Sequence, residues 1–228
     1  MTLDTKNSTS IGKQIQLLIQ NKTISATTVA LSRRDYLYSN CDTDNSLYLV
    51  LQGRIKVVTV NPEGKESLLH IATPGDLAGE SCLAAESRFD SAIAMTPATV
   101  KRLCHNELLT ALTDNGLRRM LIEFLAQRVR EQQQLITDLI TVNSERRLAS
   151  TLLHLAQKMG YRAGTTLQLR ERITQEELAA MVGTTRSRIG FFLKRFRESG
   201  ILQTVDGHLL VFDEPRLRNF IECGELSM

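Results

Sequence analysis

The sequence predicts an α+β protein that consists of an N-terminal antiparallel β-roll, a long helix and a C-terminal winged helix-turn-helix. Three observations predict this arrangement. Short β-branched runs separated by turn residues fill positions 29–103, an unbroken helical pattern follows, and two short capped helices with a hairpin come after it. We therefore divide the 228 residues into a β-roll domain (1–113), a long helix with a hinge (114–143) and a helix-turn-helix domain (144–228).

A short helix is expected before the β-roll, because apolar residues recur at helical spacing between positions 11 and 20. The β-roll itself is predicted from apolar runs at 47–51, 55–60 and 68–71, which have the length and composition of strands. Glycines recur every eleven residues between these runs and mark the turns. They are Gly53, Gly64 and Gly75, with Pro62 and Pro74 beside two of them.

The helical pattern from Asp114 to about Val142 is long enough for a coiled coil. The predicted seam residues are separated by four, four, three, four and three positions, which is an a/d pattern with one stutter. They are Leu121, Leu125, Val129, Gln132, Ile136 and Leu139. The additional apolar residues Ile122, Phe124 and Ile140 predict that one flank packs on the chain's own β domain. We therefore expect different neighbours to bury the two faces.

The pattern breaks at Asn143-Ser144, where we expect a hinge. Ser144 can cap a new helix that ends near Gly160. The apolar face of this helix is predicted to comprise Leu148, Leu152, Leu155 and Ala156.

Residues 173–200 predict two helices joined by a tight turn. Thr174 and Glu177 have the spacing of a capping box, and Gly183 can supply the positive φ that ends the first helix. Thr185 is then expected to cap the second helix. Ile189, Leu193 and Phe196 recur at i, i+4 and i+7 and form its predicted buried stripe.

The outward face of the second helix is predicted to be basic, because residues 184–198 contain five Lys or Arg and one Glu. This pattern is typical of a recognition helix that enters the major groove of DNA. Arg186 suits a bidentate contact with guanine, and Ser187 or Arg188 could add a base or phosphate contact. The cations further along the helix are better candidates for contacts with phosphate. The full predicted set is Thr184, Thr185, Arg186, Ser187, Arg188, Lys194, Arg195 and Arg197.

A two-residue hairpin with an Asp206-Gly207 turn is expected after this helix and would form the wing, between apolar runs at 201–205 and 208–211. His208 lies at its tip and is expected to be a surface histidine. No metal site is predicted, because no second histidine or cysteine stands at ligand spacing.

Charge and cysteine usage agree with these expectations. The first 143 residues contain 15 Lys or Arg and 15 Asp or Glu, whereas residues 144–228 contain 13 and 10, so the net charge of +3 belongs to the second part. The sequence shows no secretory leader and no apolar run that could cross a membrane, which predicts a cytoplasmic protein.

The scattered cysteines are expected to be buried apolar filler rather than cluster ligands. They are Cys41, Cys82, Cys104 and Cys223.

Together these features resemble the CRP/FNR family of transcriptional regulators over nearly the whole chain. The resemblance rests on Gly-Asp-Leu-Ala-Gly-Glu at 75–80, the long helix, Arg-Leu-Ala-Ser-Thr-Leu-Leu at 147–153 and the helix-turn-helix. Gly75, Asp76, Gly79 and Glu80 match the opening of the family's phosphate-binding cassette, which holds the phosphate and ribose of a cyclic nucleotide.

The later half of the cassette departs from the family's pattern. Cyclic-AMP-binding members place an arginine directly before a Ser-Ala pair, but here Asp90 precedes Ser91 and Arg88 lies further back. A carboxylate would repel the phosphate, so cyclic AMP is not the expected effector. Arg88 could instead serve an anionic metabolite such as a carboxylic acid.

Two positions of the long helix also differ. Gln132 and Gln133 stand where cyclic-AMP receptors contact adenine through hydroxyl residues. Either the pocket is adapted to another effector, or Gln132 only sets the register of the seam and Gln133 is solvated. The effector-pocket candidates are therefore Gly79, Glu80, Arg88, Asp90, Ser91, Gln132 and Gln133.

No cofactor is expected, because the family's N-terminal cysteine cluster and its Cys-x-His pair are both missing. In the recognition helix Arg186 matches the family's first base-reading arginine, whereas Ser187 replaces a glutamate and Phe191 stands where another arginine is common. The operator should therefore differ from the familiar consensus.

The resemblance implies a homodimeric regulator that binds a palindromic site on double-stranded DNA and contacts RNA polymerase if it activates transcription. It would be controlled by an effector other than cyclic AMP, or be active without one. The alternative is a ligand or redox sensor whose winged helix contacts a protein partner. An enzyme is not expected, because no nucleophile-base or metal constellation is present.

Overall fold

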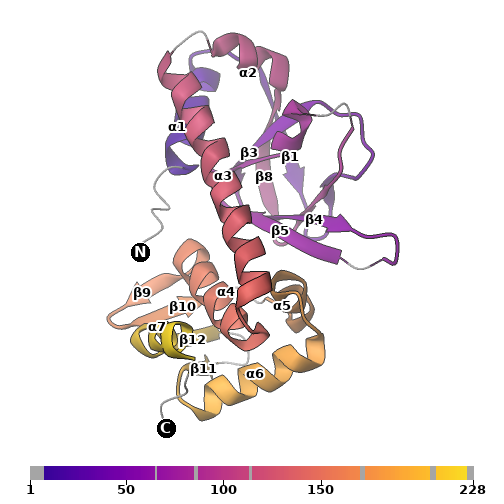
Figure 1. The fold of residues 1–228 in the computed structure, drawn as a ribbon. Coiled ribbons are helices and arrows are strands. Elements are labelled where there is room, and N and C mark those ends of the chain that lie inside the picture. Colours follow the sequence, from indigo (N-terminus) through magenta and orange to yellow (C-terminus); the bar gives the residue numbers. More distant parts are fainter. Residues whose placement is uncertain are drawn as a thin grey trace. The chain divides into compact units, whose positions relative to one another are not determined.

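The computed structural model describes residues 8–64, 66–84, 87–112, 115–169, 173–205 and 209–224. The chain forms two compact units, Met1–Glu131 and Gln132–Met228, and the boundary between them falls within the long helix α3. Figure 1 labels most of the helices and strands of each unit.

The first unit is the predicted antiparallel β-roll with helices at both ends of its sequence (Figure 1). One sheet has the strand order β1-β8-β3-β6 and the other β2-β7-β4-β5. The predicted runs 47–51, 55–60 and 68–71 lie in β3, β4 and β5, as expected. The elements are α1 (Ser8–Gln20), β1 (Ala26–Leu31), β2 (Tyr36–Tyr38), β3 (Ser46–Gln52), β4 (Ile55–Val60), β5 (Glu66–Ala72), β6 (Leu77–Ala78), η1 (Glu80–Leu83), β7 (Ser91–Ala94), β8 (Ala98–Cys104), α2 (His105–Ala111) and the start of α3 (Asn115–Thr141).

Two apolar clusters stabilise this unit. One joins side chains from β3 and β8 with α1 and α3, and includes Ile15, Leu47 and Leu117. The other lies between the two sheets around Val57 and Val100. Burial of large aliphatic side chains of this kind contributes about 1.5–3 kcal/mol each.

The long helix uses fewer of its apolar residues for its own β-roll than expected. Leu121 and Phe124 are buried in the cluster with Leu117, one and two turns along the same face. The prediction that Ile122 and Ile140 pack on the same flank is wrong, because both side chains are exposed. Ile122 lies about 100° around the helix from buried Leu121 and therefore points away from the buried face, whereas Ile140 lies in a stretch of α3 where its neighbours Leu139 and Thr141 are exposed as well.

The second unit is a winged helix-turn-helix (Figure 1). Its sheet has the order β11-β12-β10-β9, in which all pairs are antiparallel. The hairpin of β9 and β10 was not identified from the sequence. The elements are the end of α3, α4 (Ser144–Met159), β9 (Tyr161–Ala163), β10 (Thr166–Leu169), α5 (Gln175–Val182), α6 (Arg186–Glu198), β11 (Leu202–Val205), β12 (Leu209–Asp213) and α7 (Glu214–Cys223).

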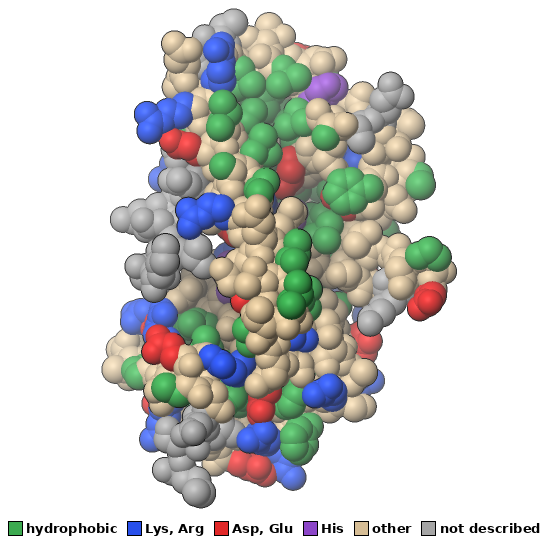
Figure 2. Space-filling model, in the orientation of Figure 1, with side chains coloured by type: hydrophobic (Ala, Val, Ile, Leu, Met, Phe, Trp, Pro, Cys, Tyr) green, Lys and Arg blue, Asp and Glu red, His purple; other side chains and the backbone are tan. Residues whose placement is uncertain are grey.

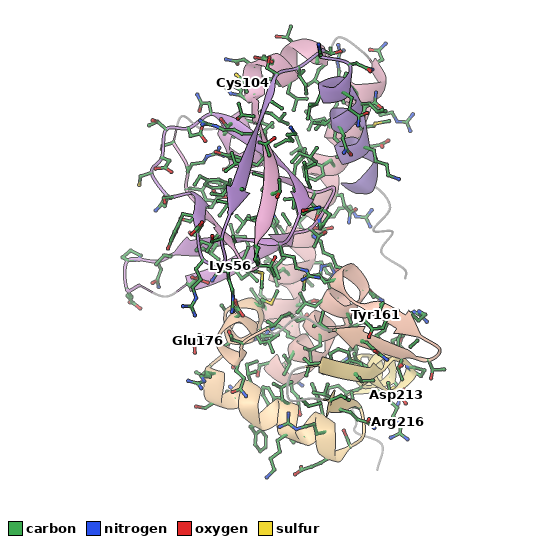
Figure 3. The ribbon with its side chains drawn as sticks, turned by 180° about the vertical axis from the view of Figure 1, so that it is seen from behind. Lys56, Cys104, Tyr161, Glu176, Asp213 and Arg216 are labelled. Carbon is green, nitrogen blue, oxygen red and sulfur yellow. The ribbon has the colours of Figure 1, made fainter. Side chains whose placement is uncertain are left out.

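The predicted wing corresponds to β11 and β12, where Val205 pairs with Leu209. Asp206, Gly207 and His208 lie outside the described residues. At the far end of β12, Asp213 accepts a hydrogen bond from the backbone N of Arg216 at 3.0 Å and so caps α7. Figure 3 shows these two side chains close together at the start of that helix.

Helix α4 begins one residue from the predicted cap. Asn143, not Ser144, is the N-cap, and its Oδ1 accepts a hydrogen bond from the backbone N of Arg146 at 2.9 Å. Ser144 is buried inside the first turn, which leaves the neighbouring asparagine to satisfy the free amides. The predicted apolar face of α4 is buried in full, and the helix ends before Gly160 as expected.

The expectation for the cysteines is right at one position only. Cys82 is buried, whereas Cys41, Cys104 and Cys223 are exposed. None of the described helices combines the length and apolarity needed to cross a bilayer.

Candidate nucleic-acid interface

The turn between α5 and α6 is built from the residues that the sequence indicates. Thr174 Oγ1 accepts a hydrogen bond from the backbone N of Glu177 at 3.1 Å, and Glu177 Oε2 accepts one from the backbone N of Thr174 at 2.8 Å. Gly183 has φ 68° and ends α5, and Thr185 caps α6. The capping box and both caps are therefore confirmed.

The inner side of α6 is fully apolar. Ile189, Leu193 and Phe196 are buried as predicted, and Phe192, which was not included in the predicted stripe, is buried with them. Gly190 allows a close approach of α5, because a Cβ there would lie 3.3 Å from Gln175 Oε1. These contacts hold α6 with its opposite side toward solvent.

That outer side carries most of the predicted contact residues. Arg186, Ser187, Arg188, Lys194 and Arg197 are exposed, as is the capping residue Thr185, while Thr184 is half-buried. No ion pair or hydrogen bond engages the Arg186 guanidinium within the described ranges. Figure 2 shows Lys and Arg side chains gathered over α6. The face is therefore positively charged and accessible, as a surface that meets phosphate must be.

Two cations of α6 are paired within the protein: Lys194 Nζ lies 3.7 Å from Glu198 Oε1 of the same helix, and Arg195 pairs with an acid outside it. Arg195 Nη1 lies 2.8 Å from Glu145 Oε2 on α4, so its charge is partly compensated within the protein. Burial raises the pKa of the Glu145 carboxyl, and Arg195 opposes that rise. Local sequence patterns could not predict this pair, because 50 residues separate its members.

The effector-pocket candidates of the β-roll surround a buried arginine. Arg88 is only 2% exposed, and its guanidinium donates to the carbonyl oxygens of Gly79, at 2.5 Å, and Ser46. It also lies over the Tyr38 ring at 4.3 Å from the centroid. An anionic ligand that used Arg88 would therefore have to compete with two backbone carbonyls.

The acidic candidates are also engaged. Asp90 Oδ1 accepts a hydrogen bond from Ser81 at 3.2 Å, and burial raises the pKa of its carboxyl. Glu80 Oε1 lies 3.2 Å from Arg128 Nε on α3. Burial raises the pKa of Glu80, and the Arg128 charge opposes the rise. Sequence reasoning missed Arg128.

The remaining candidates are Ser91 in the first unit and Gln132 and Gln133 in the second. Ser91 accepts a hydrogen bond from the backbone N of Asn40 at 2.9 Å. Gln132 and Gln133 are exposed and belong to the second unit, so their role in a pocket stays a prediction.

Comparisons with known proteins match both units. The cyclic nucleotide-binding domain family matches residues 18–115, and the Crp-like helix-turn-helix domain family matches residues 146–220. The chain belongs to the CRP/FNR family of transcriptional regulators. Its fold and its DNA-binding helix-turn-helix are those of this family.

Similar CRP/FNR proteins cover most of the chain. A CRP-like cAMP-activated global transcriptional regulator of Mycobacterium tuberculosis is 29% identical over 87% of this chain and 92% of the relative. The fumarate and nitrate reduction regulatory protein of Vibrio cholerae is 25% identical over 79% of this chain and 73% of its own.

Solved CRP/FNR structures share the fold. FixK2 from Bradyrhizobium japonicum superposes with a TM-score of 0.76 at 18% identity, covering 86% of this chain and 97% of that one. The c-di-GMP responsive regulator CLP from Xanthomonas campestris gives 0.73 at 19% identity, covering 86% and 99%.

The dimer seam predicted for this CRP/FNR chain requires one revision. Leu121 is 6% exposed and packs in the β-roll cluster, with Leu125 half-buried beside it. Val129, Gln132, Ile136 and Leu139 are exposed, and Figure 2 shows hydrophobic side chains at the surface along α3. With exposed Ile122 in place of Leu121, the spacing becomes three, four, three, four, three, and the stutter disappears.

Proposed function

We propose that the protein regulates transcription as a homodimer on a two-fold symmetric operator, with α6 of each protomer in a major groove. The observation that carries this proposal is the outer face of α6, where accessible cations surround the first turn and the opposite face is buried. Two-fold symmetry would place the half-sites about one helical turn apart, ~34 Å.

The contacts divide by position on the helix. Arg186 would donate to O6 and N7 of a guanine, and Ser187 or Arg188 would add a base or phosphate contact. Lys194, Arg195 and Arg197 would contact phosphates. Thr184 and Thr185, at the start of the helix, would lie near the DNA backbone. Glu145 competes with the DNA for Arg195, so we expect that residue to contribute least.

The revised seam supports pairing through α3. Ile122, Val129 and Ile136 are exposed at heptad spacing, with Gln132 as the polar residue between them. Burying such a stripe against its copy is the usual route to a two-stranded coiled coil, and one polar seam residue fixes its register.

The β-roll would bind an effector other than cyclic AMP, or the dimer would be active without one. Asp90 stands where a phosphate would need a cation, and Arg88 is held by backbone carbonyls. We further propose that the protein acts in the cytoplasm without catalytic activity and contacts RNA polymerase when it activates transcription.

Selection of duplexes from a random pool tests the proposal. The wild-type protein should enrich a palindrome, with an affinity that falls steeply as salt rises. Arg186→Ala should lose about 1–3 kcal/mol of specific binding and relax the preference at one position of each half-site. Arg119→Ala, which removes an exposed arginine far along the sequence on α3, is the control and should bind like wild type. Equal binding to all duplexes, or no effect of Arg186→Ala, would overturn it.

A further inference from the structure

The recognition helix exposes an aromatic ring at the centre of its outer face. Phe191 is 58% exposed, although α6 buries three other apolar side chains and the next residue, Phe192. At 100° per residue, Phe191 lies with Ser187, Lys194 and Glu198 on the line opposite the buried stripe. All four are exposed. The ring therefore points where the groove floor would be when α6 docks.

Basic groups surround this ring. The Arg195 guanidinium lies 5.9 Å from the Phe191 centroid, and Lys194 is the next residue along the outer face. Both are paired, Lys194 with Glu198 at 3.7 Å and Arg195 with Glu145 at 2.8 Å. The exposed Arg186, Arg188 and Arg197 are therefore the cations that chiefly attract the polyanion and would carry the ring into the groove with the helix. Without DNA the ring keeps apolar area in water, which is unfavourable by about 25 cal/mol for each Å².

Only one base offers an apolar group on the floor of the major groove. The 5-methyl group of thymine is the apolar feature among the donor and acceptor atoms of the four base pairs, and phenylalanine is one of the side chains that pack on it. We propose that Phe191 is a specificity-determining residue that packs on a thymine methyl group in each half-site. This inference rests on the proposed docking of α6.

The spacing along the helix locates the thymine. Phe191 follows Arg186 by five residues, about 7.5 Å along the axis. Base pairs rise by about 3.4 Å. The thymine should therefore lie about two base pairs from the guanine that Arg186 contacts, on the side toward which α6 runs.

The test replaces thymine by deoxyuridine, which removes the methyl group and leaves base pairing intact. In the selected operator, a single replacement at the expected position should weaken wild-type binding roughly fourfold, and replacement in both half-sites roughly fifteenfold, as expected for one methyl group per contact. Replacements at the other thymines should have little effect.

Phe191→Ala completes a double-mutant cycle. This variant should bind the thymine and deoxyuridine operators equally, whereas Phe191→Leu should retain part of the discrimination. Tyr36→Ala removes a ring that is 59% exposed on β2 of the β-roll and should discriminate like wild type. The midpoint of thermal unfolding should be unchanged in Phe191→Ala, Phe191→Leu and Tyr36→Ala, because both native side chains are exposed.

The outcomes separate the two proposals. If no duplex is bound specifically, the proposed function fails. If binding is specific but wild type does not distinguish thymine from deoxyuridine at any position, the inference about Phe191 is overturned. It is overturned as well if Phe191→Ala still makes that distinction.

Discussion

Glu145 on α4 and Arg195 on α6 form an ion pair with 2.8 Å between Oε2 and Nη1. The carboxylate is largely buried, with 14% of the side chain exposed, whereas the arginine is 41% exposed. This pair links the recognition helix to the helix behind it and reduces the charge that α6 can offer to a phosphate.

Neutralising the acid should strengthen DNA binding. We expect Glu145→Gln to raise affinity for operator and random duplexes alike, and to steepen the slope of log affinity against log salt by about one unit. The free energy of unfolding should change by no more than about 1 kcal/mol, since one member of the pair is well exposed. Glu222→Gln on α7 is the control. An unchanged salt slope would contradict the prediction.

Glu80 should make the stability of the β-roll depend on pH. Burial raises the pKa of its carboxyl above the ordinary 4.5, although Arg128 opposes the shift. At pH values between the ordinary pKa of the unfolded chain and the raised pKa of the folded chain, the folded chain binds more protons than the unfolded chain. The free energy of unfolding therefore falls as pH rises through this interval and is level above the raised pKa.

Urea unfolding from pH 4 to pH 8 measures this slope. Glu80→Gln removes the titrating group and should flatten the curve of unfolding free energy against pH, whereas Glu123→Gln, at a partly exposed side chain of α3, should leave that curve as in wild type. Curves of equal slope for Glu80→Gln and wild type would show that the carboxyl titrates normally.

Two glycines with similar positive φ angles should respond differently to substitution. Gly64 and Gly79 have φ of 80° and 84°, but a Cβ at Gly64 would meet nothing within 4 Å, whereas one at Gly79 would lie 2.9 Å from Arg88 Nη1 and 3.1 Å from Ser46 O. Gly64→Ala should cost about 1 kcal/mol from backbone strain alone. Gly79→Ala should cost at least about 1 kcal/mol more, because the Arg88 contacts must shift. Chemical denaturation of both variants measures the difference, and equal losses would refute it.

A charge in the seam should separate the protomers. Ile136 is 57% exposed, so Ile136→Glu should leave each protomer folded while it places two like charges in the proposed coiled coil. Sedimentation velocity should then show a monomer, and affinity for the palindrome should fall. Leu109→Glu, at an exposed leucine of α2, should remain dimeric. A monomeric wild type, or a dimeric Ile136→Glu, would exclude this seam.

Local chemistry predicted most of the helix-turn-helix. The Thr174–Glu177 capping box, Gly183 at positive φ and the Thr185 cap act within three residues of each helix end, so their spacing is readable in the sequence. Where two neighbours could serve the same purpose, as Asn143 and Ser144 could, the sequence did not discriminate.

By itself the sequence determined the class of fold, the buried stripe of α6 and the basic character of its outer face, because periodicity and capping depend on residues a few positions apart. Only the tertiary structure decided that Arg195 pairs with Glu145, that Arg88 is held by the carbonyls of Gly79 and Ser46, and that Leu121 packs inward while Ile122 faces out. The physical reason is that the ion pair and the arginine contacts join distant parts of the chain. Which flank of α3 is covered likewise depends on where the β-roll lies against it.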